Sequence, residues 1–114
     1  MTTTPLFGVR ATHDDHTAHL ALDGEMDMEA VAVFHSQVCL CLSSRPEALV
    51  LDLGRLSFCD CAGLNLLLWA RERALESGAS FTLRHVRTQP GRLFAVSGTA
   101  HLLGTGQSTV TLAS

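Results

Sequence analysis

The hydrophobic positions of the chain fall into short runs with strand spacing and longer runs with helical spacing. Ala18, Leu20 and Leu22 alternate with less apolar neighbours, which is typical of a strand with one buried face. The polar residues 13–16 precede this strand and predict a hairpin turn. The continuous aliphatic run at 48–53 predicts a buried strand. Strands are predicted at 6–11, 17–22, 48–53, 81–86 and 108–112.

Three further segments have helical spacing, at 28–42, 62–77 and 90–96. The predicted core faces of the two longer helices are Val31, Phe34, Val38, Cys41 and Leu42, then Leu64, Leu67, Leu68, Ala74 and Leu75. His35 falls within the first core face, where we expect a hydrogen-bonded histidine at the edge of the core. Trp69 falls among polar positions of the second helix, so it either serves an interface or covers a neighbouring loop.

The order of these elements predicts the fold class. Strands that alternate with helices after an opening hairpin indicate an α/β domain with a mixed sheet of about five strands and helical crossovers. A chain of 114 residues is long enough for one core. We therefore expect a single domain over 1–114, with its core at about 6–112.

The segment 58–64 joins the buried strand to the second long helix, and the predicted fold is organised around this turn. Asp60 is placed to cap the helix with its carboxylate, and Gly63 permits close approach of another backbone. Asp27 is placed in the same way before the first long helix. Backbone N–H groups point outward at such a helix start and carry partial positive charge. The turn is therefore suited to presenting one side chain to a partner.

Composition and charge exclude several classes of function. The formal net charge of −3 gives no reason to expect direct nucleic-acid binding. No apolar run is long enough to span a bilayer, and the first residues lack the features of a signal peptide. We therefore expect a cytoplasmic protein that does not contact a membrane.

The cysteines and histidines do not predict a metal site. The four cysteines form two Cys-x-Cys pairs, at 39/41 and 59/61, which differ from the usual spacing of structural zinc ligands. A reducing compartment also disfavours disulfides, so we interpret all four as thiols. His13, His16 and His19 lie close in sequence, but two of them fall in a polar turn. We expect neither a metal nor a cofactor.

Several short motifs, taken in order, resemble the STAS domain of bacterial anti-sigma factor antagonists. Residues 22–27 are similar to the Gly-Glu-hydrophobic-Asp turn before the first helix of that family. Residues 50–53 and 56–60 resemble its central strand and the approach to its second helix, where 60–64 aligns with Asp-Ser-Ser-Gly-Leu. Residues 96–98 resemble the Ser-Gly after its third helix. Each motif alone is weak, but the ordered set is specific and spans nearly the whole chain.

The resemblance implies an antagonist that binds an anti-sigma factor, a serine kinase, and so releases a sigma factor. In the family the kinase phosphorylates the serine after the conserved aspartate, and that position is Cys61 here. The next position, often a second hydroxyl residue, is Ala62, and Ser57 is the nearest hydroxyl upstream. We therefore expect no phosphorylation at 61. The replacement of these hydroxyls is either natural or engineered.

The resemblance also implies a partner-binding surface made by two adjacent loops. Asp23, Glu25, Asp27 and Glu29 carry no arginine among them, and Asp60 adds a fifth carboxylate, so the surface would be acidic and suit a basic partner. The predicted partner-binding residues are Asp23, Gly24, Glu25, Asp27, Asp60, Cys61, Ala62, Gly63, Leu64 and Trp69. A weak homodimer is left open.

Two alternatives belong to other classes. The first is a STAS scaffold or sensory module that assembles with other copies or binds a small ligand. The second is an enzyme with Cys61 as its nucleophile, since a helix N-terminus favours a thiolate. A nucleophile also needs a positioned base, and no sequence motif links any histidine to Cys61. We therefore expect a binding protein without catalytic residues.

Overall fold

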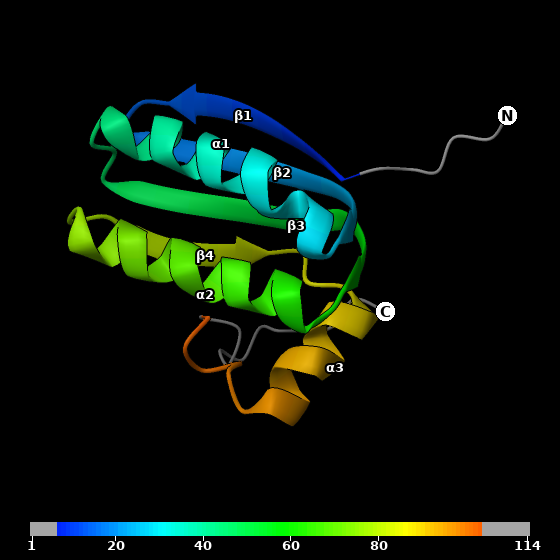
Figure 1. Ribbon diagram of the computed structural model, residues 1–114. Helices are drawn as coiled ribbons and strands as arrows, with labels where there is room; N and C mark the ends of the chain where they lie inside the picture. The colour runs from blue at the N-terminus through cyan, green and yellow to red at the C-terminus, as the bar shows by residue number, and fades with distance from the viewer. Residues whose placement is uncertain (1–6, 104–114) are drawn as a thin grey trace, which may run out of the picture.

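The computed structural model describes residues 7–103, which form a sheet with helices on one face (Figure 1). The strands are β1 (Gly8–Asp14), β2 (Thr17–Met26), β3 (Ala48–Cys59) and β4 (Ser80–Arg84). A short 3-10 turn, η1 (Met28–Ala30), leads into helix α1 (Val31–Ser43), and the later helices are α2 (Cys61–Glu76) and α3 (Thr88–Ser97). The α/β fold class predicted from the sequence is confirmed.

The sheet is mixed, with the strand order β1-β2-β3-β4. β1 and β2 form the predicted antiparallel hairpin, whereas β2, β3 and β4 run parallel to one another. Helix α1 makes the crossover from β2 to β3, and α2 makes the crossover from β3 to β4 (Figure 1). The described part of the chain thus contains four strands. The fifth predicted strand, at 108–112, lies outside the described residues.

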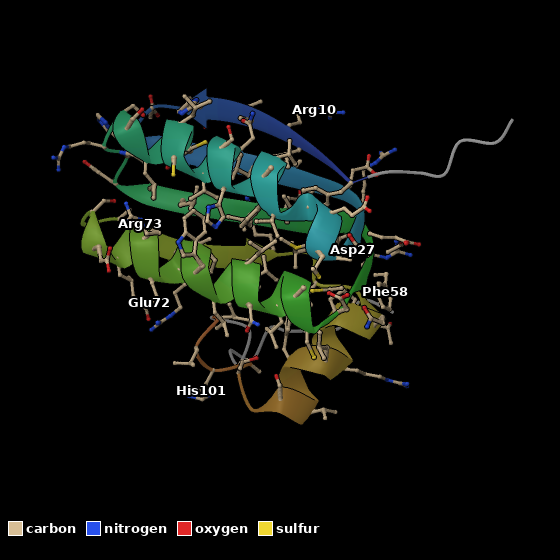
Figure 2. All side chains as sticks on the ribbon, viewed as in Figure 1. Arg10, Asp27, Phe58, Glu72, Arg73 and His101 are labelled. Atoms are coloured by element: carbon tan, nitrogen blue, oxygen red, sulfur yellow. The ribbon has the colours of Figure 1, made fainter. Side chains whose placement is uncertain are left out.

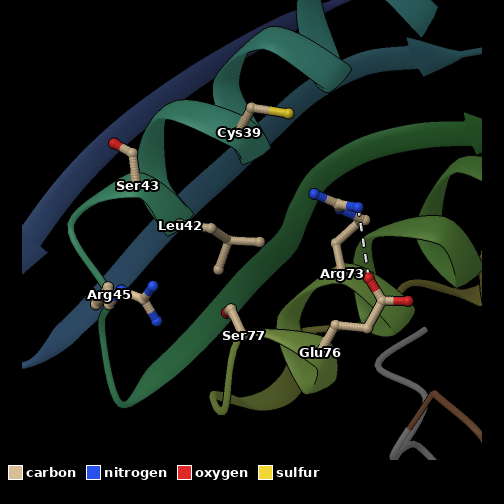
Figure 3. A pocket seen from close by; sticks show the side chains of 7 residues that line it. All are labelled: Cys39, Leu42, Ser43, Arg45, Arg73, Glu76 and Ser77. Atoms are coloured by element: carbon tan, nitrogen blue, oxygen red, sulfur yellow. Dashed lines mark hydrogen bonds and ion pairs between the residues drawn. The ribbon is translucent and has the colours of Figure 1, made fainter.

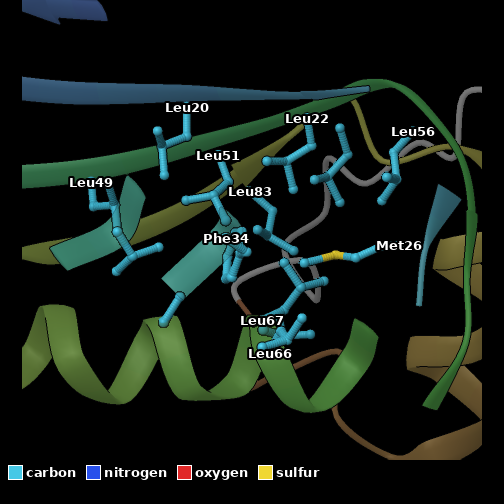
Figure 4. Packing of buried hydrophobic residues seen from close by; sticks show 14 of the residues in the cluster. Leu20, Leu22, Met26, Phe34, Leu49, Leu51, Leu56, Leu66, Leu67 and Leu83 are labelled. Atoms are coloured by element: carbon cyan, nitrogen blue, oxygen red, sulfur yellow. The ribbon is translucent and has the colours of Figure 1, made fainter. Parts of the chain in front are cut away.

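The core lies between the sheet and the two long helices (Figure 4). Leu20 of β2 and Leu49 and Leu51 of β3 are fully buried. Val50 is only half-buried, so the continuous apolar run of β3 buries one face of the strand rather than the whole strand. The three leucines pack in the same cluster as Phe34 of α1 and Leu67 of α2, which are also fully buried. Burying each of these side chains contributes about 1.5–3 kcal/mol relative to leaving it in water.

The buried helical faces differ from the predicted ones at several positions. Leu75 was expected in the core but is 47% exposed, and Leu66 was not expected there but is only 6% exposed. The buried arc of α2 is centred on small residues, among them Ala70 and Ala74, which let the helix approach its neighbours closely. This orientation turns Leu75 outward and Leu66 inward. Val31, at the margin of the buried arc of α1, is also exposed, contrary to prediction.

Trp69 lies between the two long helices. Its ring stacks on His35 of α1, with ring centroids 3.8 Å apart and planes 6° apart, and meets Phe34 edge-on at 6.4 Å. Trp69 therefore covers a neighbouring helix rather than a loop. His35 does lie at the edge of the core, but within residues 7–103 its ring makes this stack and not the predicted hydrogen bond.

Two strands extend further than the hydrophobic pattern predicts. β2 continues to Met26 rather than ending at 22, and β3 continues to Cys59 rather than ending at 53. The parallel pairing of these strands passes through register shifts at Ala21/Asp23 and Gly24/Glu25. In β3 these irregularities interrupt the alternation of buried and exposed residues after Leu53 while the backbone pairing continues. β2 keeps its alternation to Met26, but the buried position after Leu22 is Gly24, which adds no apolar side chain to the pattern. The sequence pattern therefore ends before the strands do.

Candidate functional site

The ends of β2 and β3 bring the two predicted loops side by side. In the parallel pairing, Glu25 is the partner of Phe58 and Met26 is the partner of Cys59. The backbone N–H of Asp60 then donates a hydrogen bond to the carbonyl oxygen of Met26, at 3.3 Å. Asp27 and Phe58 accordingly lie at the same end of the molecule (Figure 2). We call the segments 23–27 and 60–64 together the two-loop surface.

Gly63 allows the start of α2 to pack directly on the end of β2. A Cβ atom at this position would overlap the carbonyl oxygen of Met26 and would lie 2.9 Å from Sγ of Cys59. Real Cβ atoms do not approach neighbours this closely, so a larger residue would push the two segments apart. The prediction that Gly63 permits close backbone approach is confirmed.

Both predicted helix caps are present at this end of the sheet. Oδ1 of Asp27 accepts a hydrogen bond from the backbone N–H of Glu29, at 2.9 Å. Oδ1 of Asp60 accepts one from the backbone N–H of Gly63, at 3.0 Å. Each carboxylate satisfies one of the N–H groups that a helix start leaves without a partner. Two helical starts, η1 with α1 and α2, therefore open at the same edge, each with an aspartate in front of it.

The two thiols of the loop have different environments. Cys61 is the first residue of α2 and is exposed, whereas Cys59, two residues earlier, is fully buried. Burial, with smaller contributions from the nearby charges of Asp60 and Cys61, raises the pKa of Cys59 to about 12. Cys59 is therefore a neutral, structural thiol, while Cys61 is the thiol presented to solvent.

Two polar residues outside the predicted site hold it in place. Oε1 of Gln89 accepts from the backbone N–H of Cys59 at 2.8 Å, and Nε2 of Gln89 donates to the carbonyl oxygen of Cys59 at 2.9 Å. On the other side, Oγ of Ser57 donates to the carbonyl oxygen of Gly24 at 3.0 Å. Gln89 lies in the first turn of α3, about thirty residues after its partner. No local sequence signal marks either contact, because both join segments distant in the chain.

The surface is acidic, with one arginine close by. Nε of Arg55 lies 3.7 Å from Oδ2 of Asp23, and both side chains are exposed. Glu25 and Glu29 are also exposed. The first loop itself contains no arginine, as the sequence shows, but the neighbouring strand β3 supplies one. An exposed pair of this kind stabilises the fold little, so Asp23 remains accessible.

The residues predicted to bind a partner have three different settings. Asp23, Glu25 and Cys61 are exposed, and Asp27, Asp60 and Ala62 are half-buried. Gly24, Gly63 and Leu64 are buried, so they shape the surface without presenting side chains to it. Trp69 follows Cys61 by eight residues on α2, about 12 Å along the helix. Because its ring is stacked on His35, it lies apart from the two-loop surface.

A groove of about 450 Å³ lies between the last turns of α1 and α2 (Figure 3). In it, Nη1 of Arg73 and Oε1 of Glu76 are 3.4 Å apart, and the hydroxyls of Ser43 and Ser77 donate to carbonyl oxygens of their own helices. The two serine hydroxyls satisfy helix carbonyl groups, as polar side chains near helix C-termini commonly do, and the ion pair joins two exposed side chains of α2. The groove therefore has a structural explanation, separate from the two-loop surface.

Among residues 7–103, no cluster of three or more His, Cys, Asp or Glu side chains has the geometry to hold a metal ion. In the same part of the chain, no helix is both long and apolar enough to cross a membrane.

The comparisons with known proteins agree with this architecture. Three solved structures with a similar fold are of anti-sigma factor antagonists, and two of them show SpoIIAA in its unphosphorylated and its phosphorylated form. The antagonist from Mycobacterium paratuberculosis is 19% identical with a TM-score of 0.74, and 86% of this chain and 83% of that chain are covered. Unphosphorylated SpoIIAA is 24% identical with a TM-score of 0.63, with 84% of each chain covered. The phosphorylated Bacillus cell fate determinant SpoIIAA is 23% identical with a TM-score of 0.57, and 84% of this chain and 86% of that chain are covered.

No curated protein matches the chain by sequence. The family described as "Mlab, STAS domain" does match, over residues 9–104. Because this match spans most of the chain, the protein belongs to the STAS domain family.

Proposed function

We propose that this chain is an anti-sigma factor antagonist, a non-enzymatic cytoplasmic protein that binds an anti-sigma factor serine kinase and thereby releases a sigma factor. The observation that carries the proposal is the pairing of Met26 with Cys59, which places two acidic loops and two helix starts at one edge. Similar folds belong to proteins named as anti-sigma factor antagonists. An acidic edge of this kind selects a basic partner and speeds its approach.

We further propose that the antagonist has no phosphorylation switch at this edge. Cys61 occupies the first position of α2, where the resemblance expects the acceptor serine, and a thiol offers no hydroxyl. Ala62 follows it. The nearest upstream hydroxyl, that of Ser57, is engaged with the carbonyl oxygen of Gly24 at 3.0 Å. The kinase would therefore bind this protein without the means to inactivate it at residue 61.

The environment of Cys61 supports a binding role over a catalytic one. Within residues 7–103, no histidine or other base forms a hydrogen bond with the Cys61 thiol. A cysteine nucleophile needs such a base, positioned in turn by a third group. Cys61 is therefore proposed as a contact residue rather than as a nucleophile.

The experiment is a calorimetric titration of the protein with each anti-sigma factor kinase encoded in its host. Glu25→Lys reverses an exposed charge within the two-loop surface, and Glu47→Lys reverses an exposed charge just before β3, at the opposite end of the sheet. We expect one kinase to bind the wild-type protein. Glu25→Lys should raise the Kd of this complex at least about tenfold, and Glu47→Lys should leave the Kd unchanged.

Three results would contradict the proposal or a part of it. Failure of every encoded kinase to bind the wild-type protein would remove it. Large self-assemblies in a sedimentation experiment, without kinase binding, would favour the scaffold alternative. Equal weakening by both charge reversals would mean that the attraction is general and that the two-loop surface is not the contact.

A further inference from the structure

We infer that Met28 and Phe58 form the apolar centre of the contact with the anti-sigma factor, and that the partner presents an apolar patch bordered by basic side chains. The inference rests on the proposed function, because it describes how that partner is held. Neither residue belongs to the partner-binding set predicted from the sequence. Together they extend the two-loop surface on both of its sides along the chain.

The first observation is exposure combined with position. Met28 is 72% exposed and Phe58 is 40% exposed. Single exposed apolar residues are ordinary in globular proteins, and this chain has others, such as Leu40. What distinguishes Met28 and Phe58 is their location. Met28 directly follows the capping residue Asp27, and Phe58 is the strand partner of Glu25.

The second observation is that the backbone around Phe58 is fixed on both sides. The residue before it, Ser57, is joined to Gly24 at 3.0 Å. The residue after it, Cys59, is held by both polar atoms of the Gln89 side chain, at 2.8 and 2.9 Å. An aromatic side chain on a fixed backbone loses little freedom on binding, which is the property of an interface anchor.

Met28 has a complementary character. Its backbone lies in the η1 turn, which the carboxylate of Asp27 caps at 2.9 Å and whose Ala30 N–H bonds to the carbonyl oxygen of Asp27 at 3.0 Å. Its side chain is unbranched and projects into solvent, so it can adapt to the shape of a partner. η1 also lies beside α2, which begins at Cys61. Met28 and Phe58 therefore provide an adaptable and a rigid apolar contact at the same end of the sheet, next to the two-loop surface in the chain.

The third observation is the distribution of charge. The segments 23–29 and 55–64 together carry five carboxylates and one arginine, although the formal net charge of the whole chain is only −3. Negative charge is thus concentrated around Met28 and Phe58. Nucleic acids and anionic membranes would be repelled by such a surface. A protein with an apolar patch and a basic border is the partner that fits, since interfaces combine an apolar centre with a polar rim.

The test measures the association and dissociation rates of the anti-sigma factor with Met28→Gln, Phe58→Ser and the control Leu40→Gln. Leu40 is 62% exposed and lies on α1, about 18 Å along the helical path from Met28. We expect each of the first two variants to raise Kd at least about tenfold, mainly through faster dissociation and with unchanged salt dependence. Leu40→Gln should bind as the wild type does. Thermal melts establish that each variant is folded. If Phe58→Ser is unstable, the Kd of Met28→Gln tests the inference, because Met28 is highly exposed and its replacement should not affect folding.

The outcomes separate this inference from the proposed function. If the kinase binds the wild-type protein and both variants equally, the apolar centre is wrong while the antagonist function stands. If Leu40→Gln loses as much affinity as Met28→Gln, the effect is not localised and the inference is again overturned. If no encoded kinase binds the wild-type protein, the proposed function fails and the inference fails with it.

Discussion

The carbonyl oxygen of Met26 and the backbone of Gly63 are in direct contact, with no room for a side chain between them. A Cβ at position 63 would overlap that oxygen and would lie 3.0 Å from Cγ of Met26. Met26 ends β2, and Gly63 lies in the first turn of α2. This contact therefore fixes the two loops of the proposed binding surface against each other.

Gly63→Ala should lower the free energy of unfolding by about 1–3 kcal/mol, because the added methyl group forces the two segments apart. The matched control is Gly8→Ala, whose Cβ would meet its nearest neighbour, Cβ of Asp23, at 3.9 Å. That distance is ordinary contact, so the control should change stability by less than about 0.5 kcal/mol. Urea unfolding measures both. Equal stability of the two variants would show that the contact does not constrain the loops.

The two capping aspartates allow stability and binding to be separated. Asp27→Ala and Asp60→Ala should each cost about 1 kcal/mol of stability, since the cap to Glu29 or Gly63 is lost. Asp27→Asn and Asp60→Asn should stay close to wild-type stability, because asparagine caps equally well. All four variants should bind the anti-sigma factor more weakly, because all four remove a carboxylate from the surface. Parallel melts and titrations test this; wild-type affinity of the asparagine variants would mean that the aspartates are only structural.

The sequence predicts the architecture well because the apolar pattern determines which faces are buried. The alternation at Ala18, Leu20 and Leu22, the caps at Asp27 and Asp60, and the fold class are all confirmed. Local patterns suffice for these features, since each depends on neighbours within a few residues.

The parts that the sequence does not predict depend on contacts between distant segments. The side chain of Gln89 bonds to Cys59 across about thirty residues, and the pairing of β2 with β3 continues past the register shifts. The rotation of α2 that exposes Leu75 follows from the small residues Ala70 and Ala74 packing inward. None of these relationships has a signature within a single element.

A pair of leucines on α2 tests that rotation directly. Leu64→Asp should unfold the domain or nearly so, because Leu64 is 5% exposed and a buried carboxylate without a partner is costly. Leu75→Asp should be tolerated, because Leu75 is 47% exposed on the same helix. Circular dichroism during thermal unfolding distinguishes them. A stable Leu64→Asp variant would show that the assigned face of α2 is wrong.

Two of the four thiols should react readily in the native protein, and the other two should be protected. Cys39 and Cys61 are exposed, and Cys41 and Cys59 are buried. Native protein should therefore react rapidly at two thiols with a chromogenic disulfide reagent, and at all four in denaturant. Rapid reaction of all four in the native protein would contradict the burial of Cys59.

The pH dependence of stability follows from the same burial. Burial first, then the nearby charges of Asp60 and Cys61, raise the pKa of Cys59 to about 12, above the value of about 8.5 for an unfolded thiol. The protonated thiol therefore stabilises the fold fully below pH of about 8.5, and this contribution is lost as pH rises toward 12. Cys59→Ala should show a weaker loss of stability over that alkaline range. An unchanged pH profile would mean that Cys59 does not contribute.

The most direct measurement of the central claim is phosphate incorporation at residue 61. Wild-type protein, Cys61→Ser and the control Cys61→Ala are incubated with the cognate anti-sigma factor kinase and ATP, and their masses are measured. Cys61→Ser should gain one phosphate, because serine closely matches cysteine in size and the start of α2 favours an anion there. The wild-type protein and Cys61→Ala should gain none, and the phosphorylated variant should release the kinase, since its surface gains a charge of about −1.5 to −2 beside Asp60. Equal incorporation into the wild-type protein and Cys61→Ser would place the acceptor elsewhere and would contradict a permanently unphosphorylated surface at Cys61.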